Sequence, residues 1–270
     1  KLVRYSQIHG LTKKADETYI VNALMDALGM TEFTFPETTT TIGNSVLCGC
    51  ESLQKVTFLS HNIETMGTGV FRYCHSLHTI TLPEGLTTIP VGTFDECYAL
   101  ETLVIPENVT TIGAAAFEEC RGLKSIYISE KITDIADDFS GCYSLTGIWV
   151  AEDNAVYCSD EFGVLFNKNK TKIIVFPAGY EGAYVIPDSI TSMTSGMFKN
   201  SKITSITIYT TNATQLTNLK NAIGTAYEYT VDEAKFSVTI NFAEPVTSFV
   251  LSHAGSTTAY ISGVDVITTK

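Results

Sequence analysis

Apolar residues along this chain recur in units of the form leucine-x-x-leucine-x-leucine, in which other large apolar residues can replace leucine. The first six units are spaced 22 to 24 residues apart and a further one follows later; they begin at Met30, Leu53, Leu77, Leu100, Leu123, Leu145 and Ile203. The last positions of each unit alternate apolar and polar residues, which predicts a short strand. A turn follows, often through a proline, which cannot donate to a strand ladder.

The second half of each unit carries an apolar pair, such as Val109 and Ile112, and then a segment of small residues. Within that segment a phenylalanine precedes a cysteine by three positions, as in Phe71/Cys74, Phe94/Cys97, Phe117/Cys120 and Phe139/Cys142. We expect this segment to form a short helical turn on the convex side. One unit cannot bury its own apolar face, whereas stacked units can, so the repeat predicts a solenoid.

The pattern resembles the leucine-rich repeats of the BspA type, found in surface proteins of mucosal and gut bacteria and in some protists. The resemblance rests on L-x-x-I-x-I-P, V-x-x-I-G and A-x-x-F-x-x-C, is clearest at 100–128, and covers about residues 30–208. It implies a leucine-rich-repeat solenoid, a strand-rich α/β fold with a parallel concave sheet. The chain departs from the better-known leucine-rich pattern, because the slots after the strands hold a single asparagine among His61, Gly85, Asn108 and Lys131.

The regions outside the regular units predict caps and an insert. Residues 16–28 read as an amphipathic helix before Gly29, which predicts an N-terminal helical cap over 1–29. The repeats then span 30–208, with an insert at 151–184 in which two apolar runs flank a polar "NKNK", as in a β-hairpin. Residues 209–270 combine a helix at 213–224 with alternating runs, and form either a C-terminal cap or the start of a further β-rich module.

Five of the seven cysteines, Cys50, Cys74, Cys97, Cys120 and Cys142, follow the repeat and form one column. Parallel side chains on rungs about 4.8 Å apart do not converge as a disulfide requires, so we expect buried structural thiols. Cys48 and Cys158 fall outside the column, and Cys158, in a predicted loop, is the better candidate for a reactive thiol. The sequence C-H-x-x-H at Cys74, His75 and His78 lacks a second ligand pair at zinc-finger spacing, so no metal site is expected.

The composition narrows the function classes. The net charge of −12 disfavours nucleic acid as a partner and is compatible with a basic one, although it also serves solubility alone. No apolar run approaches the length that spans a bilayer. No phosphate-binding loop, nucleophile elbow or zinc-protease motif is present, and the acid pairs 95/96, 118/119 and 137/138 recur with the repeat as a solvated stripe would. We therefore expect neither an enzyme nor a cofactor.

The concave sheet carries the candidate binding residues. The two residues that flank the central apolar position of each strand point away from the core, and most of them are threonine or serine. Val104, Tyr127 and Trp149 break this pattern on consecutive rungs, beside the small residues Ser125 and Thr102. An exposed aromatic ridge has the composition of a binding hot spot. The alternative is that the insert or the tail folds over the ridge and makes it an internal contact.

The function that these features favour is non-catalytic recognition, by a secreted or cell-surface protein. The family resemblance implies adhesion to host matrix proteins or to other cells, with a protein ligand on the concave sheet. Two alternatives stay open. One is binding of carbohydrate or mucin glycans, in which Tyr127 and Trp149 would stack on sugar rings; the other is a structural spacer that displays another module. Lys1 is not an initiator residue, so the lack of a visible leader carries no information on export.

Overall fold

The computed structural model describes residues 29–136, 139–190, 198, 201–223, 228–242, 260–261 and 264–265. The chain divides into two compact units, the first formed by Lys1–Leu145 and Val150–Ala155, the second by Thr146–Trp149 and Val156–Lys270. The N-terminal helix expected at 16–28 lies outside the described residues.

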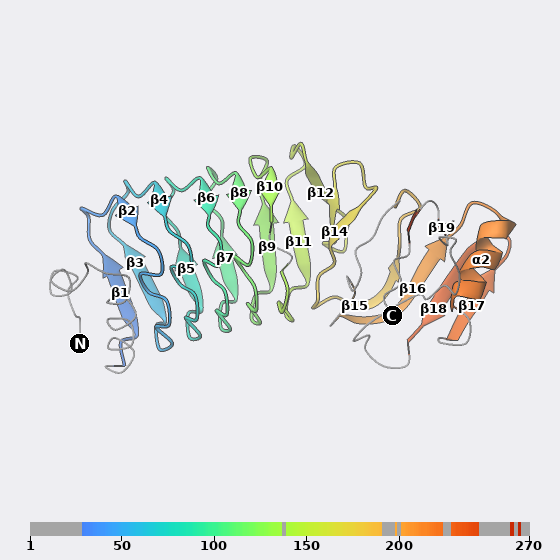
Figure 1. Ribbon diagram of the computed structural model, residues 1–270, viewed down its shortest axis with the longest axis horizontal. Helices are drawn as coiled ribbons and strands as arrows, with labels where there is room; N and C mark the ends of the chain where they lie inside the picture. The colour runs from blue at the N-terminus through green and yellow to red at the C-terminus, as the bar shows by residue number, and fades with distance from the viewer. Residues whose placement is uncertain are drawn as a thin grey trace. The chain divides into compact units, whose positions relative to one another are not determined.

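The first unit is built from two ladders of short parallel strands, which Figure 1 shows side by side. The first ladder holds β1 (Glu32–Phe35), β3 (Lys55–Phe58), β5 (Thr79–Thr81), β7 (Thr102–Val104) and β9 (Ser125–Ile128). The second holds β2 (Thr41–Ile42), β4 (Thr65–Met66), β6 (Thr88–Ile89), β8 (Thr111–Ile112) and β10 (Asp134–Ile135). One strand from each ladder, with the turns that join them, makes a rung. Thr81 pairs with Val104 and Ile89 with Ile112, so each strand residue pairs with its counterpart one repeat later.

The turn side, opposite the first ladder, differs from the expected helical turns. The segments there are successive tight turns, with bonds such as Cys97 N–H to the Phe94 carbonyl at 2.9 Å. Left-handed residues recur five and one positions before Cys50, Cys74, Cys97 and Cys120, for example Ala115 (φ 53°) and Glu119 (φ 55°), and a helix cannot continue through them. Alternate backbone N–H groups donate instead to the next rung, as Phe94 does to the Ala116 carbonyl at 2.8 Å. The prediction of convex helical turns was therefore wrong.

The core of the first unit consists of the predicted columns. The rings of Phe71, Phe94, Phe117 and Phe139 are buried and stack at centroid distances of 5.5, 5.7 and 5.7 Å. The column cysteines are buried beside them, and the Sγ of Cys97 donates to the Phe71 carbonyl at 3.1 Å. The same bond joins Cys120 to Phe94 and Cys142 to Phe117, each at 3.1 Å. The prediction of a buried, structural thiol column is confirmed.

An asparagine that the sequence reasoning overlooked closes the last rung of this unit. Asn154 is buried, and its Nδ2 donates to the carbonyls of Ser129 at 2.7 Å and Ile132 at 2.8 Å. It lies 23 residues after Lys131, which makes it the next member of the slot that follows the strands. Asn108, in the same slot, is exposed, so the two asparagines do not form a ladder.

The second unit is less regular. After β11 (Gly147–Val150), the strands β12 (Tyr157–Ser159), β13 (Leu165–Asn167) and β14 (Ile173–Val175) form an antiparallel sheet. The strands β13 and β14 flank the polar "NKNK" turn, where the hairpin was expected. A mixed sheet follows in the order β15–β16–β18–β17, from β15 (Glu181–Val185), β16 (Lys202–Tyr209), β18 (Ser237–Asn241) and β17 (Glu228–Asp232).

The helix α2 (Ala213–Ile223) forms where the sequence predicts it and buries Leu216, Leu219 and Ile223 against this sheet. It begins at Asn212, whose Oδ1 accepts a bond from the Gln215 backbone N–H at 3.0 Å, as an N-cap does. The repeat strand β16 pairs in parallel with β15 and antiparallel with β18, so a tail strand occupies its second edge. Two short strands, β19 (Tyr260–Ile261) and β20 (Val264–Asp265), pair antiparallel. The domain boundaries drawn from the sequence stay a prediction.

Candidate binding face

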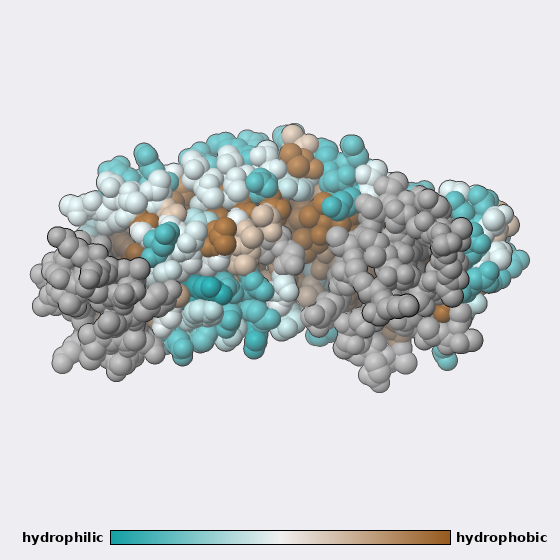
Figure 2. All heavy atoms as spheres, viewed as in Figure 1, coloured by the Kyte–Doolittle hydropathy of each residue, from teal (hydrophilic) through white to brown (hydrophobic). Residues whose placement is uncertain are grey.

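The outward side of the first ladder, called the strand face below, is formed by β1, β3, β5, β7 and β9. The residues that flank each central apolar position are exposed or half-buried, while the central residues Phe33, Val56, Ile80, Leu103 and Ile126 are buried. Alternation along the strands therefore places the predicted residues outward. Figure 2 shows apolar patches along the middle of this face, with hydrophilic residues above and below them.

Val104 and Tyr127 are the large apolar side chains that stand out from this face. Val104 is 79% exposed and Tyr127 is 58% exposed, and they occupy the same position on the neighbouring strands β7 and β9. Thr102 and Ser125, the two small neighbours on the same strands, are also exposed. These four residues lie together in the first unit, as the sequence predicts. No described residue covers the two large side chains.

Trp149, the third member of the predicted ridge, belongs to the second unit. It is 42% exposed, and its ring lies over Gly147, where an added Cβ would come within 2.8 Å of Cζ2. The insert touches this strand, because the Ile148 N–H donates to the Gly163 carbonyl at 2.8 Å, yet it leaves the indole partly open. A single ridge of three residues stays a prediction.

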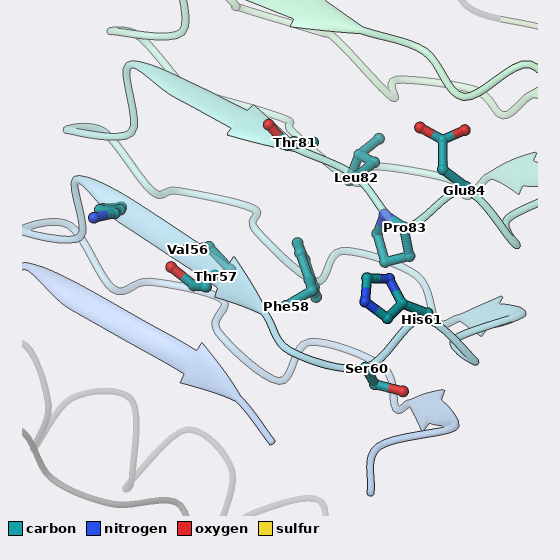
Figure 3. A pocket seen from close by; sticks show the side chains of 10 residues that line it. Val56, Thr57, Phe58, Ser60, His61, Thr81, Leu82, Pro83 and Glu84 are labelled. Carbon is teal, nitrogen blue, oxygen red and sulfur yellow. The ribbon is translucent and has the colours of Figure 1, made fainter. Parts of the chain in front are cut away.

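A hollow of about 480 Å³ opens on the strand face between β3 and β5 (Figure 3). Its apolar wall comes from Val56, Phe58, Leu82 and Pro83, and its polar lining from Lys55, Thr57, Ser60, His61, Thr81 and Glu84. Figure 3 shows Phe58 and His61 on the β3 side, facing Leu82 and Pro83 on the β5 side. An apolar floor with a polar rim is the usual lining of a site that receives one apolar group.

Two local features of the chain open this hollow. The second rung has one more residue than its neighbours between its strand and the next apolar pair, which bends the chain outward at Leu59 and buries Ser60. In the second rung, the Leu59 N–H donates to the Phe35 carbonyl of the first rung at 3.0 Å. The equivalent position in the third rung is Pro83, which has no N–H. The strand β3 pairs with β1 and β5 with β7, and the ladder is interrupted between them.

A row of glutamates borders the carboxyl ends of the first-ladder strands. The same tight turn closes five rungs, with a bond from the fourth residue's N–H to the first residue's carbonyl, and the second residue is Glu37, Glu84, Glu107, Glu130 or Glu152. Glu84, Glu107 and Glu130 lie on consecutive rungs, are exposed, and make no ion pair within the described part of the chain. These three residues are called the acidic row below. Like charges one rung apart repel.

The comparison with known families is decisive for the architecture. Residues 19–146 and 183–224, well over half of the chain, match the model of the BspA type leucine rich repeat region in six copies. The chain belongs to this family.

Solved structures of other proteins share the fold of this BspA-type chain. The pneumococcal vaccine antigen PcpA is 22% identical with a TM-score of 0.55, over 64% of this chain and 44% of that one. A leucine-rich repeat protein from Eubacterium ventriosum is 23% identical with a TM-score of 0.57, over 76% of this chain and 52% of that one. The BspA-type chain thus spans about half the length of these structures. A search of curated proteins found no match.

The other candidate sites of this BspA-type protein are tied up in internal contacts. Asp95, expected in a solvated acidic stripe, is instead buried and meets Arg72 at 2.7 Å. Burial raises the pKa of its carboxyl above the ordinary value, although Arg72 acts in the opposite direction. Glu119 pairs with Arg121 at 2.8 Å, and Glu96 accepts a hydrogen bond from the Tyr98 hydroxyl. The solvated-stripe interpretation was wrong for the described residues; 137 and 138 lie outside them.

The residues of the C-H-x-x-H motif diverge. The Cys74 thiol donates to the Leu47 carbonyl at 3.2 Å, the His75 ring stacks on Tyr98 at 4.5 Å, and the Nδ1 of His78 lies 2.7 Å from the Ser76 carbonyl. Among the residues that the structure describes, no group of three or more histidine, cysteine or acidic side chains could hold a metal ion. Nor does any helix in that part of the chain have the length and apolar character needed to cross a membrane.

The thiol of Cys158 is half-buried, and its Sγ lies 3.3 Å from the Asn167 carbonyl. Burial raises the pKa of this thiol, although Lys170 and Lys168 lower it. A raised pKa reduces the thiolate fraction and with it the reactivity. The geometry therefore gives no support to the prediction that Cys158 is a reactive thiol.

Sequence reasoning missed the hollow and the acidic row. The signal for the hollow was the single spacing of 24 residues among spacings of 22 and 23, which marks the extra residue of the second rung. The signal for the acidic row was the repeated Pro-Glu that follows a strand at 83–84 and 106–107. Both signals become interpretable only once the turns are aligned on one another.

Proposed function

We propose that this chain is a non-catalytic recognition protein, secreted or held at a cell surface, that binds a protein ligand on its strand face. The observation that carries the proposal is the exposure of Val104 and Tyr127, at 79% and 58%, on adjacent rungs of a face made mostly of threonine and serine. An exposed aromatic side chain with an apolar neighbour and a hydroxyl border is the composition of an interaction hot spot.

The family supports the class of function, since leucine-rich repeat domains generally bind proteins. Resemblance to BspA-type proteins implies adhesion to host matrix proteins or to other cells, and we propose the same class of ligand here. A parallel ladder suits this task, because its outward side chains project at fixed positions about 4.8 Å apart and lose little freedom when a partner docks.

The test compares immobilised matrix proteins as ligands for the parent chain and for a Val104→Ser/Tyr127→Ala variant. Both substitutions lie on the exposed face, so the fold should persist, and circular dichroism checks that it does. The variant should lose tenfold or more in affinity, which corresponds to about 1.4 kcal/mol. The matched control is Tyr143→Ala, because Tyr143 is an exposed tyrosine of the same unit that lies just after Cys142, on the turn side.

Equal binding by parent and variant would exclude the strand face as the site and would favour the spacer interpretation. A second candidate function, binding of mucin glycans, is favoured by the part-exposed indole of Trp149. If this function is correct, a free glycan should saturate binding to the parent chain, and a Trp149→Ala variant should lose that binding.

A further inference from the structure

The strand face carries three features that lie in a row across the rungs: the hollow between β3 and β5, then Val104 on β7, then Tyr127 on β9. Thr81 borders the hollow and pairs directly with Val104, so the hollow joins the column that contains both ridge residues. With neighbouring strands about 4.8 Å apart, Val104 lies about 7 Å from the centre of the hollow along this row and Tyr127 lies about 12 Å from it.

The total span of this row, about 12 Å, is close to the length that three alternate side chains of an extended polypeptide cover. Alternate side chains on one face of an extended chain are about 6.7 Å apart, so residues i, i+2 and i+4 span about 13 Å. A chain laid across the rungs could place one apolar side chain in the hollow, the second against Val104 and the third against Tyr127. The apolar wall formed by Phe58, Leu82 and Pro83 is suited to the first of these side chains.

The charge of the border then selects the partner. Glu84, Glu107 and Glu130 stand at the carboxyl ends of β5, β7 and β9, which are the strand that borders the hollow and the two strands that carry the ridge. Neither Lys131 nor Lys55 forms an ion pair with a glutamate of the row. The amine of Lys131 donates to Asn108 Oδ1 at 3.1 Å, and Lys55 lines the β3 side of the hollow, at the start of its strand.

No ion pair offsets the repulsion within the row among the described residues. Unit charges about 5 Å apart repel by roughly 0.8 kcal/mol in water, and a cation beside the row converts this repulsion into attraction. Complementary charge of this kind directs a partner to one register and speeds its approach. A chain with a net charge of −12 adds a long-range attraction for the same kind of partner.

We infer that the partner of the strand face is an extended, basic polypeptide segment, in which apolar residues at alternate positions contact the hollow, Val104 and Tyr127 while lysine or arginine side chains reach the acidic row. The inference rests on the proposed function and names the chemical class of its ligand. It makes binding depend on two separable groups of residues, the apolar row and the acidic row.

Fluorescence anisotropy with a short labelled peptide that alternates lysine and valine tests the inference, with a glutamate–valine peptide as the reversed charge. The acidic-row variant is Glu84→Gln/Glu107→Gln/Glu130→Gln. Its matched control is Glu161→Gln/Asp188→Asn/Glu228→Gln, which removes the same charge from exposed positions in the second unit. A Thr81→Trp variant obstructs the hollow from an exposed position and leaves the acidic row in place.

The lysine–valine peptide should bind the parent and the control variant within twofold of each other. It should bind the acidic-row variant and Thr81→Trp at least tenfold more weakly, and added salt should weaken its binding to the parent. Equal binding of both peptides, or an acidic-row variant that binds like the parent, overturns the basic partner. If matrix-protein binding in that case still depends on Tyr127, the proposed function stands without this inference. If neither depends on the strand face, both fall.

Discussion

The charged side chains of the first unit form ion pairs on the turn side, but the acidic row at the border of the strand face forms none among the described residues. On the turn side, Asp95 meets Arg72 at 2.7 Å and Glu119 meets Arg121 at 2.8 Å, each pair within one rung or between adjacent rungs. At the border of the strand face, Glu84, Glu107 and Glu130 repeat the same charge without an ion pair among the described residues. Charges that are neutralised internally serve the fold, whereas an unneutralised row at fixed spacing is available to a partner.

The largest effect expected comes from neither surface but from the core that both share. Phe117→Ala removes the ring that stacks on Phe94 and Phe139, at 5.7 Å from each, and leaves a cavity between three rungs. The free energy of unfolding should fall by about 3–5 kcal/mol, measured by urea denaturation. A loss below about 1 kcal/mol would contradict the phenylalanine column.

The next effect tests the paired charges of the turn side. Asp95→Asn should change the free energy of unfolding by less than about 1 kcal/mol at pH 7, because losing the attraction to the half-exposed Arg72 is offset by relief of the burial cost of the carboxylate. Since burial raises the pKa of Asp95, the folded state binds a proton more tightly than the unfolded state does. The parent should therefore gain stability relative to the variant as the pH falls through that raised pKa.

Urea denaturation of both proteins at pH 7 and pH 4 measures this change. A variant that becomes more stable relative to the parent at pH 4 would contradict this expectation. It would show that the Arg72–Asp95 pair stabilises the fold in its ionised form.

The smallest effect separates the two surfaces by its sign. Glu107→Gln relieves repulsion in the acidic row and should raise the free energy of unfolding by about 0.3 kcal/mol at low salt. Glu119→Gln breaks the pair with Arg121 and should lower the free energy of unfolding slightly. Thermal denaturation at low and high salt checks both changes, which should shrink as salt screens the charges. Changes of the same sign would remove the distinction between the two surfaces.

The sequence predicts the columns of this fold because burial repeats with the spacing of the chain. Phe117 and Cys120 are buried as expected, since a stacked rung offers each position the same neighbours. The turn side was not predictable in the same way. The run "AAAFEE" has good helix formers, yet Ala115 and Glu119 are left-handed because bonds to the next rung fix them, such as Glu119 N–H to the Ser140 carbonyl at 2.7 Å.

The candidate site likewise combines features that the sequence pattern predicts with features that depend on contacts between rungs. The outward positions of Val104 and Tyr127 follow from simple alternation along a strand, and both side chains are exposed. The hollow depends on an extra residue in one rung and on a missing proline N–H in the next, which act only when the rungs are side by side. Alternation also predicts the exposure of Trp149, but it could not predict that this residue belongs to the second unit.

The thiol column gives the first unit a built-in set of kinetic probes. Cys74, Cys97, Cys120 and Cys142 are fully buried, one per rung, and each Sγ–H donates to a backbone carbonyl of the previous rung, that of Leu47 for Cys74 and that of a column phenylalanine for the others. A reagent in solution can reach such a sulfur only after the rung around it opens. The labelling rate of each cysteine therefore reports the opening free energy of its own rung, and together the rates show whether the solenoid opens as one block or frays from an end.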